Sequence, residues 1–416
     1  VWAPCVSEKD GVFYLLYTNV RSFDGPFKDT PNYLVTSDGM FGPWSEPVYL
    51  NSLGFDSSLF HDDDGRSWLV NMIVDHRGGR FFGGIVLQEF DCEKLQLVGD
   101  IHYLTPGTKL GCTEGPHIYR KDGYYYLMLA EGGTGYEHAM TIMRSRDITG
   151  PYELHPDNPI ISSAGSPDAY LQKTGHGDFV ETPNGEWYAV FLAGRPLPGT
   201  GFCTLGRESA IEKIEWRDDG WPWLAAGGRV ARREVEAPDL LPHPWPEAPS
   251  RIDFNDPAMD ISFQSLRIPM TPDWCTLEER PGFLRLYGQE SLGSTFRQSL
   301  VARRVQSHKV RAETVVEFDP DNFQQMAGLI CYYNTYHYHY LHVHGDDLGG
   351  DTNKKFLKII TCNKYALEEP LADPIDITGA TCVGMRVDFD GADLRFAYRI
   401  DSGDWLTVGG VLDGSI

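Results

Sequence analysis

The chain has 416 residues, which is too many for one ordinary hydrophobic core, so two domains are expected. Its 44 glycines, 27 prolines and 12% of aromatic residues, without long stretches of helical period, favour short strands and tight turns, as in an all-β protein. The formal net charge of -23, without a run of Lys and Arg, argues against nucleic acid and anionic membranes as partners and favours a neutral or cationic ligand.

The eight cysteines occur singly, without a CxxC pair or the spacing of a zinc site, so we expect reduced and mostly buried thiols. They are Cys5, Cys92, Cys112, Cys203, Cys275, Cys331, Cys362 and Cys382.

The two ends of the chain indicate a fragment, because it opens inside an apparent motif and stops without closing its last strand pattern. No apolar stretch reaches the roughly 18 residues needed to cross a bilayer, and the first four residues do not form a signal peptide. We expect a cytoplasmic protein, and secretion stays open because a signal sequence would precede Val1.

Four segments share one plan, in which an Asp-Gly or Asn-Gly turn leads into an aromatic-rich run, as in a hairpin. Their glycines, Gly11, Gly65, Gly123 and Gly185, are spaced by 54, 58 and 62 residues. Hairpins in a β-sandwich are the alternative, but regular spacing favours repeated four-stranded propeller blades. At least four blades are predicted.

The repeats stop near Trp223, and the proline-rich segment 236–250 is incompatible with a helix or a central strand, which predicts a linker. From Arg251 onward, runs of alternating character predict a two-sheet sandwich. We therefore expect a propeller over 1–235, the linker, and a sandwich over 251–416 whose C-terminal end is incomplete.

Asp56, Glu114 and Arg207 are charged residues next to apolar and aromatic runs, so each is a candidate for partial burial. Burial and a second carboxylate both raise a carboxyl pKa, which lets an acid keep its proton near neutral pH. Glycosidic cleavage needs such an acid to protonate the departing oxygen. In contrast, residues 62–64 resemble a solvated Asp-rich turn without a chemical role.

Five ordered motifs, at 1–4, 55–62, 113–117, 175–177 and 206–208, closely resemble glycoside hydrolase family 43, over essentially all of the chain. The branch that it resembles most is that of β-xylosidases with a C-terminal sandwich. The resemblance implies a five-bladed β-propeller, with its first blade largely missing from this chain and the active site at its axis. A concanavalin-like β-sandwich would follow.

By this resemblance Glu114 matches the general acid, and Asp56 matches the carboxylate that raises the pKa of the acid and orients it. The alternatives are a surface Glu and an ordinary turn Asp. The family's third carboxylate, an Asp that activates water, is expected upstream of Val1.

His176 resembles the family's axial histidine, which holds a water or a calcium ion, and a structural histidine is the alternative. No cofactor is required, and calcium at the axis stays open although it prefers oxygen ligands. Arg207 resembles a residue that grips sugar hydroxyls, for which a guanidinium is suited. Its alternative role is an ion pair with Glu208 or Glu212.

Trp2, Phe55 and Thr134 match positions that line the family's sugar pocket, with simple core packing as the alternative for the rings. The tyrosine-rich stretch 332–340 is either a loop over the pocket or a strand with outward tyrosines.

The resemblance implies an inverting enzyme that releases xylose from the non-reducing end of xylobiose and xylooligosaccharides. The rivals are an α-L-arabinofuranosidase acting on arabinosyl-decorated oligosaccharides, a non-catalytic sugar-binding propeller if the base Asp is truly absent, and, more weakly, a protein-interaction propeller. Fold alone does not decide the substrate. The sequence does not decide whether the protein forms a homo-oligomer.

Overall fold

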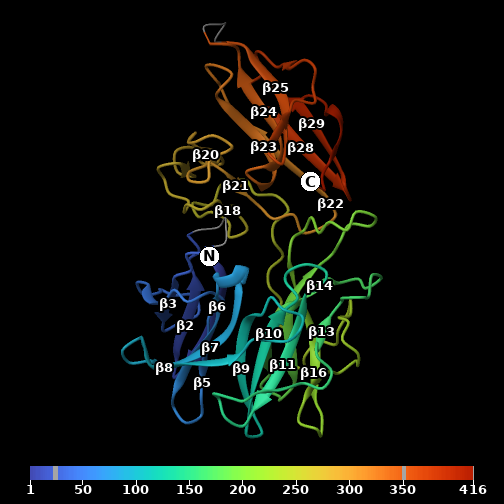
Figure 1. Cartoon of the computed structure of the whole chain (residues 1–416). Coiled ribbons are helices and arrows are strands. Elements are labelled where there is room, and N and C mark those ends of the chain that lie inside the picture. The colour runs from blue at the N-terminus through green and yellow to red at the C-terminus, as the bar shows by residue number, and fades with distance from the viewer. Residues whose placement is uncertain (22–26, 349–352, 416) are drawn as a thin grey trace. The chain divides into compact units, whose positions relative to one another are not determined.

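A computed structural model describes residues 1–21, 27–348 and 353–415, which form two compact units (Figure 1). The first unit comprises Val1–Arg195 and Gly206–Leu241, and the second comprises Pro196–Leu205 and Pro242–Ile416. The expected linker is thus divided at Leu241. Its first part stays with the first unit because Glu186 accepts a hydrogen bond from the amide of Asp239, at 2.7 Å.

The first unit contains four antiparallel sheets, each with strands paired in chain order, as in propeller blades. The first blade consists of β1 (Trp2–Lys9), β2 (Val12–Thr18), β3 (Asn32–Ser37) and β4 (Val48–Asn51). The second consists of β5 (Ser58–His61), β6 (Ser67–Val74), β7 (Phe82–Asp91) and β8 (Gln96–Thr105). The third consists of β9 (Glu114–Lys121), β10 (Tyr124–Glu131), β11 (Ala139–Ser145), β12 (Glu153–Leu154) and the short β13 (Ile161–Ser162), which pairs with β11. The fourth consists of β14 (Gln172–Glu181), β15 (Trp187–Gly194), β16 (Glu208–Trp216) and β17 (Pro222–Leu224).

Each predicted Asp-Gly or Asn-Gly turn joins the first two strands of one blade, so the four repeats are confirmed as four blades. The described residues of the first unit form no fifth blade, and the blade expected before Val1 stays a prediction. The one helical element of the described residues is a short turn, η1 (Arg77–Gly79), so the protein is all-β.

Buried apolar side chains join neighbouring blades. The three clusters include Leu16, Leu34, Leu59 and Leu69 between blades one and two; Val70, Leu87, Leu127 and Met143 between blades two and three; and Met128, Ile142, Phe191 and Ile214 between blades three and four. The first strands of successive blades touch, β1 with β5, β5 with β9 and β9 with β14. Residues at the ends of these strands therefore converge.

The second unit is a sandwich of two antiparallel sheets. One sheet has the order β22 (Lys309–Val316), β28 (Val383–Asp390), β29 (Asp393–Ile400) and β30 (Leu406–Asp413). The other has the order β23 (Met326–Asn334), β24 (His337–Gly345), β25 (Lys355–Asn363) and β26 (Ala366–Glu368), with β27 (Ile375–Asp376) beside β25. Two short ladders precede them, β18 (Gln264–Ser265) with β21 (Val301–Ala302) and β19 (Cys275–Thr276) with β20 (Arg285–Leu286).

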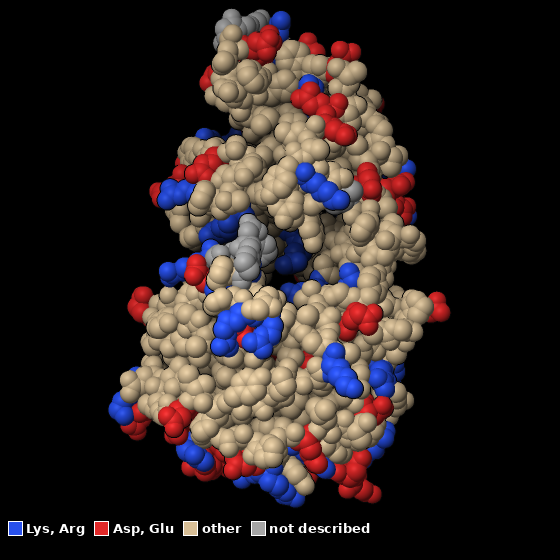
Figure 2. All heavy atoms as spheres, in the orientation of Figure 1, with Lys and Arg blue, Asp and Glu red and all other residues tan. Residues whose placement is uncertain are grey.

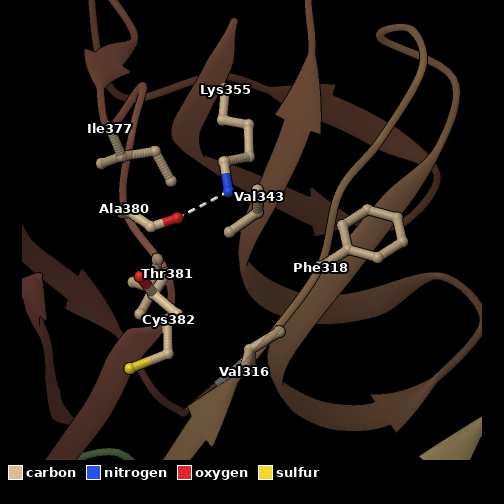
Figure 3. A pocket seen from close by; sticks show the side chains of 9 residues that line it. Val316, Phe318, Val343, Lys355, Ile377, Ala380, Thr381 and Cys382 are labelled. Carbon is tan, nitrogen blue, oxygen red and sulfur yellow. Dashed lines mark hydrogen bonds between the residues drawn. The ribbon is translucent and has the colours of Figure 1, made fainter. Parts of the chain in front are cut away.

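Both main sheets of the sandwich contribute to one core, which includes Leu341, Leu357, Met385 and Phe396. A small hollow at its edge is lined mainly by apolar side chains, and Lys355 donates from Nζ to the carbonyl of Ala380, at 2.7 Å (Figure 3). The lining of this hollow contains no carboxylate and no imidazole, and the ammonium group of Lys355 is occupied by the carbonyl of Ala380.

The tyrosine-rich stretch 332–340 is a hairpin of β23 and β24, so the expectation of a loop is wrong. Apart from Tyr336 in the turn, the tyrosines do belong to sandwich strands. Tyr333 points outward and is exposed, whereas Tyr338 and Tyr340 are buried. They pack in one cluster with Cys362 and the partly buried Leu292, which covers this face of the sheet.

Acidic and basic side chains are interspersed over the visible surface (Figure 2). All eight cysteines lie among the described residues and are free thiols, as expected, but the expectation of mostly buried thiols is wrong, because only Cys275 and Cys362 are buried and the other six are partly exposed. In the described part of the chain, no helix is long and apolar enough to cross a membrane.

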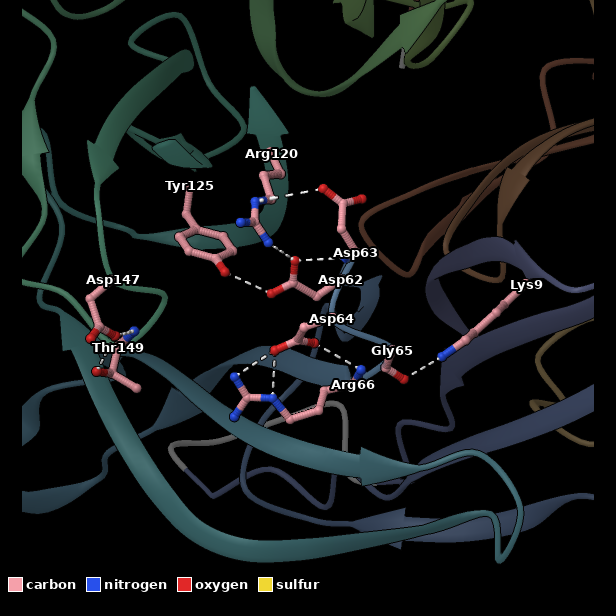
Figure 4. Close-up of polar contacts among 10 residues, drawn as sticks. All are labelled: Lys9, Asp62, Asp63, Asp64, Gly65, Arg66, Arg120, Tyr125, Asp147 and Thr149. Atoms are coloured by element: carbon pink, nitrogen blue, oxygen red, sulfur yellow. Dashed lines mark hydrogen bonds and ion pairs between the residues drawn. The ribbon is translucent and has the colours of Figure 1, made fainter. Parts of the chain in front are cut away.

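The Asp-rich turn after β5 corrects one expectation, because Asp62 is buried rather than solvated (Figure 4). Its carboxylate accepts hydrogen bonds from the hydroxyl of Tyr125, at 2.7 Å, and from the guanidinium of Arg120. Asp63 and Asp64 remain partly or largely exposed. A buried carboxylate needs such donors to offset its lost hydration. Asp62 therefore links the second blade to the third.

We expect Asp62→Ala to lower the midpoint of thermal unfolding of the propeller by about 2–6 °C, because Arg120 and Tyr125 lose their shared acceptor. Asp63→Ala is the control, since the side chain of Asp63 is 84% exposed. Differential scanning calorimetry of both variants checks this, and equal midpoints would contradict the role given to Asp62.

Candidate active site

Asp56, Glu114 and His176 come together from three successive blades. Asp56 precedes β5, Glu114 opens β9 and His176 lies in β14. One ligand atom of each residue lies within 4.8 Å of those of the other two. The convergence expected from the sequence motifs is thus present, at the place where the first strands of the blades meet.

Asp56 is held by the backbone of the next blade. Its Oδ2 accepts a hydrogen bond from the amide of Gly115, at 3.1 Å, and lies 3.9 Å from Nε2 of His176. Asp56 also has a φ of 55°, which is uncommon for a residue with a Cβ. A strained and buried conformation therefore aims its carboxylate at Glu114, so the alternative of an ordinary turn Asp does not describe it.

Glycine is required at position 115 by the approach of the imidazole. A Cβ on Gly115 would lie 2.7 Å from Nε2 of His176, which is closer than real contacts. His176 itself is an extra residue in the ladder between β14 and β15, with a φ of 47°. Such a bulge redirects a side chain, and here it turns the imidazole toward the two carboxylates.

Burial raises the pKa of Asp56 to about 7, and the hydrogen bond from Gly115 and the positive charge of Arg207 oppose this. Burial, followed by the negative charge of Asp56, raises the pKa of Glu114 to about 8. Because the two carboxyls share one poorly hydrated space, both charges are unfavourable together. The pair retains a proton near neutral pH, and Glu114 is the member that holds it more strongly.

His176 is neutral at physiological pH, since burial and the nearby positive charges lower its pKa to about 3. A neutral imidazole can bind a water or a sugar hydroxyl without competing with Glu114 for the proton. It does not supply a permanent charge to the site.

Arg207 is exposed and makes no hydrogen bond or ion pair with any described residue. The acids proposed as its alternative partners are occupied: Glu208 is paired with Arg195 at 2.7 Å, and Glu212 with Arg232 at 2.9 Å. The ion-pair alternative for Arg207 is therefore wrong. Its positive charge lowers the pKa of Asp56 and of Glu114, so Arg207 lies near enough to the carboxyl pair to affect its charge.

The three residues that match the family's sugar pocket differ from one another in exposure. Phe55 is 4% exposed and belongs to the core between blades two and three, so core packing describes it better than a pocket wall. Trp2 is partly exposed and meets the edge of Phe55, with ring centroids 5.1 Å apart. Thr134 is exposed in the loop after β10. Of the three, Trp2 has both a packed ring and an accessible part.

The sequence motifs missed two buried residues near the site. A Cβ on Gly175 would lie 2.6 Å from the ring of His138, whose Nδ1 lies 3.0 Å from the carbonyl oxygen of Lys173. Nothing in the sequence around His138 distinguishes it. Glu131 is fully buried at the end of β10. The sequence does single out Glu131, because this acidic residue directly follows the apolar run 124–130. Asp56 and Glu114 likewise lie next to apolar residues.

A calcium ion is poorly suited to this cluster. Calcium takes six to eight oxygen ligands, whereas in the described residues the cluster provides two carboxylates and one imidazole. A cation would also require both carboxyls to be ionised, against the raised pKa values of Asp56 and Glu114. The donor set fits a shared proton better than a metal.

Two family profiles cover most of the chain. Residues 1–222 match glycosyl hydrolases family 43, and residues 251–416 match the β-xylosidase C-terminal concanavalin A-like domain. The crystal structure of a xylan β-1,4-xylosidase from Bacillus halodurans C-125 is similar, with a TM-score of 0.96 and 50% identity, and covers 100% of this chain and 79% of that chain.

Curated relatives agree with these profiles. A β-xylosidase of Bacillus subtilis (strain 168) is 46% identical over 421 residues, which cover 98% of this chain and 78% of the relative. A xylosidase/arabinosidase 43B of Humicola insolens is 44% identical over 422 residues, which cover 100% of this chain and 77% of the relative.

We expect Asp56→Asn to lower the pKa of Glu114 from about 8 toward, but not to, its ordinary value of 4.5. The substitution removes a negative charge, while burial still raises the pKa. Titration of the labelled carboxyl carbon by NMR measures this, with Asp63→Asn as the exposed control. An unchanged or increased pKa in the Asp56 variant would show that the two carboxyls are not coupled.

Proposed function

Because the chain belongs to glycosyl hydrolase family 43, we propose that it releases xylose from the non-reducing end of β-1,4-linked xylooligosaccharides, with inversion at the anomeric carbon. The observation that carries this proposal is the buried pair of Asp56 and Glu114, which holds a proton near neutral pH. The names of the similar proteins from Bacillus subtilis and Bacillus halodurans support xylose as the sugar.

In the proposed reaction, Glu114 donates its proton to the glycosidic oxygen as the bond to the anomeric carbon breaks. The carboxyl of Glu114 makes no hydrogen bond with other described residues, which leaves it available to this oxygen. Asp56 keeps Glu114 protonated until the substrate arrives. A protonated acid is needed because a sugar alkoxide is a poor leaving group.

Three further residues are proposed to bind the sugar. Arg207 offers free guanidinium donors to hydroxyl groups, and neutral His176 offers a ring nitrogen beside Asp56. Trp2 is proposed to pack on the apolar face of the pentose. Each of these residues fixes the position of the anomeric carbon relative to Glu114.

Inversion also requires a carboxylate that activates water, roughly 6.5–9.5 Å from the acid so that the water fits between them and the sugar. We place this base in an Asp upstream of Val1, as the family resemblance implies. Water then attacks the anomeric carbon on the face opposite Glu114, and the base takes one proton from this water. The proton of Glu114 stays on the departing hydroxyl group, so the reaction consumes one water and the protons balance.

An α-L-arabinofuranosidase is the second candidate, favoured by the double name of the Humicola insolens relative. We expect the protein that includes the proposed base upstream of Val1 to release xylose from xylobiose with kcat/KM at least about tenfold above that for 4-nitrophenyl α-L-arabinofuranoside, a difference of about 1.4 kcal/mol in transition-state binding. Product chromatography and NMR of the first anomer formed check both points. Sole release of arabinose would favour the second candidate, and binding without hydrolysis would favour a sugar-binding propeller.

We further expect Glu114→Gln to reduce kcat/KM for xylobiose by roughly 10²–10⁴-fold, which is the usual contribution of a general acid. The loss on an aryl xyloside with a good leaving group should stay below about tenfold, since such a group departs without protonation. Steady-state kinetics on both substrates measure the ratio, with the exposed Glu137→Gln as control. Equal losses on the two substrates would show that Glu114 is not the acid.

A further inference from the structure

Glu131 is a buried carboxylate without a cationic partner. It ends β10 with no exposed surface, and it forms no ion pair with any described residue. Buried acids are usually paired with a cation or a metal, because the loss of hydration is costly. The position of Glu131 therefore needs an explanation from its hydrogen bonds.

Four donors surround the carboxylate of Glu131. Oε1 accepts from the amide of Thr108 at 2.6 Å and from the hydroxyl of Thr113 at 2.9 Å. Oε2 accepts from the hydroxyls of Thr108 and Thr141, each at 2.7 Å. Three of the four donors lie in the segment 106–113, which connects β8 of the second blade to β9 of the third.

This connection leads directly to the proposed acid, because Thr113 is followed by Glu114. The segment packs tightly on Glu131, since a Cβ on Gly107 would lie 2.5 Å from Oε1 of Glu131. A backbone hydrogen bond from Gly132 to the carbonyl of Gly111, at 2.8 Å, holds the same segment. The start of β9 is thus tied to the end of β10.

The register of the two strands shows why an additional tie is useful. β9 and β10 pair regularly as far as Met128, but a register shift follows before Ala130 meets Glu114. The ladder is therefore irregular where the acid begins, and its hydrogen bonds alone do not define the position of Glu114. Glu131 supplies the missing constraint through side-chain hydrogen bonds.

We propose that Glu131 is a positioning residue for the general acid: it holds the segment 106–113 through Thr108 and Thr113 and thereby sets the place of Glu114. This inference rests on the proposed glycosidase function. Glu131 does not touch the substrate. A displacement of about 1 Å in a catalytic group can cost 10²-fold in rate, so a structural tie at this point has a catalytic effect.

The test compares two substrates in the protein that includes the proposed base upstream of Val1 and carries Glu131→Gln, which replaces one acceptor oxygen by a donor. We expect kcat/KM for xylobiose to fall roughly 10–100-fold and that for a dinitrophenyl xyloside to fall less than about threefold. A merely structural role would lower both values together, because it would reduce the amount of active protein without regard to the leaving group.

Two threonine variants provide the matched comparison, and they keep the test decisive if the Gln variant does not fold. Thr113→Val removes the donor next to Glu114, whereas Thr141→Val removes a donor on β11, away from the connection. We expect the dependence on the leaving group in Thr113→Val only. Equal losses on both substrates in Thr113→Val, or the same selective loss in Thr141→Val, would overturn the positioning role.

Hydrogen exchange of the segment 106–114 separates this inference from the function on which it rests. We expect faster exchange in Thr113→Val than in Thr141→Val, with no change over β14 in either variant. Failure of the unsubstituted protein that includes the proposed base to hydrolyse either xyloside would contradict the proposed function alone. Unchanged exchange of the segment in Thr113→Val would contradict the tie through Glu131, whatever the substrate.

Discussion

The close approach of the first strands of the blades is the constraint on which the site depends. Asp56, Glu114 and His176 have ligand atoms within 4.8 Å of one another, although they come from three different blades. The imidazole of His176 can come this close to the next blade only because Gly115 has no Cβ. Asp56 and His176 both have left-handed backbone conformations, with φ of 55° and 47°, which are uncommon for residues with a Cβ and cluster at functional sites.

This crowding gives the site its electrostatics. Two carboxyls placed together away from water favour one shared proton, so the pKa of Glu114 rises to about 8 without any special chemistry of the residue itself. Arg207 limits the effect, because its positive charge lowers the pKa of both acids. The site thus combines an acid that stays protonated near neutrality with a cation that has free donors.

Buried carboxylates outside the pair tie successive blades together. Asp62, at the end of β5, binds Arg120 and Tyr125 of the third blade. Glu131, at the end of β10, binds the connection that arrives from the second blade. A propeller blade packs on its neighbours mainly through apolar faces, which allow small displacements. Directional hydrogen bonds to a buried charge reduce that freedom, and those of Glu131 act where the catalytic geometry is required.

Local patterns in the sequence determined the all-β class, the four hairpin repeats, the two-domain plan and the candidates Asp56, Glu114 and Arg207, and the family resemblance added His176. These features depend on turn chemistry, strand period and motif order, which neighbouring residues encode. Only the tertiary structure decided that Asp62 is buried, that Arg207 is free of Glu208 and Glu212, and that Glu131 holds the connection to Glu114. Burial and pairing of a charged side chain depend on which strands pack against it, and residues far apart in the chain provide those strands.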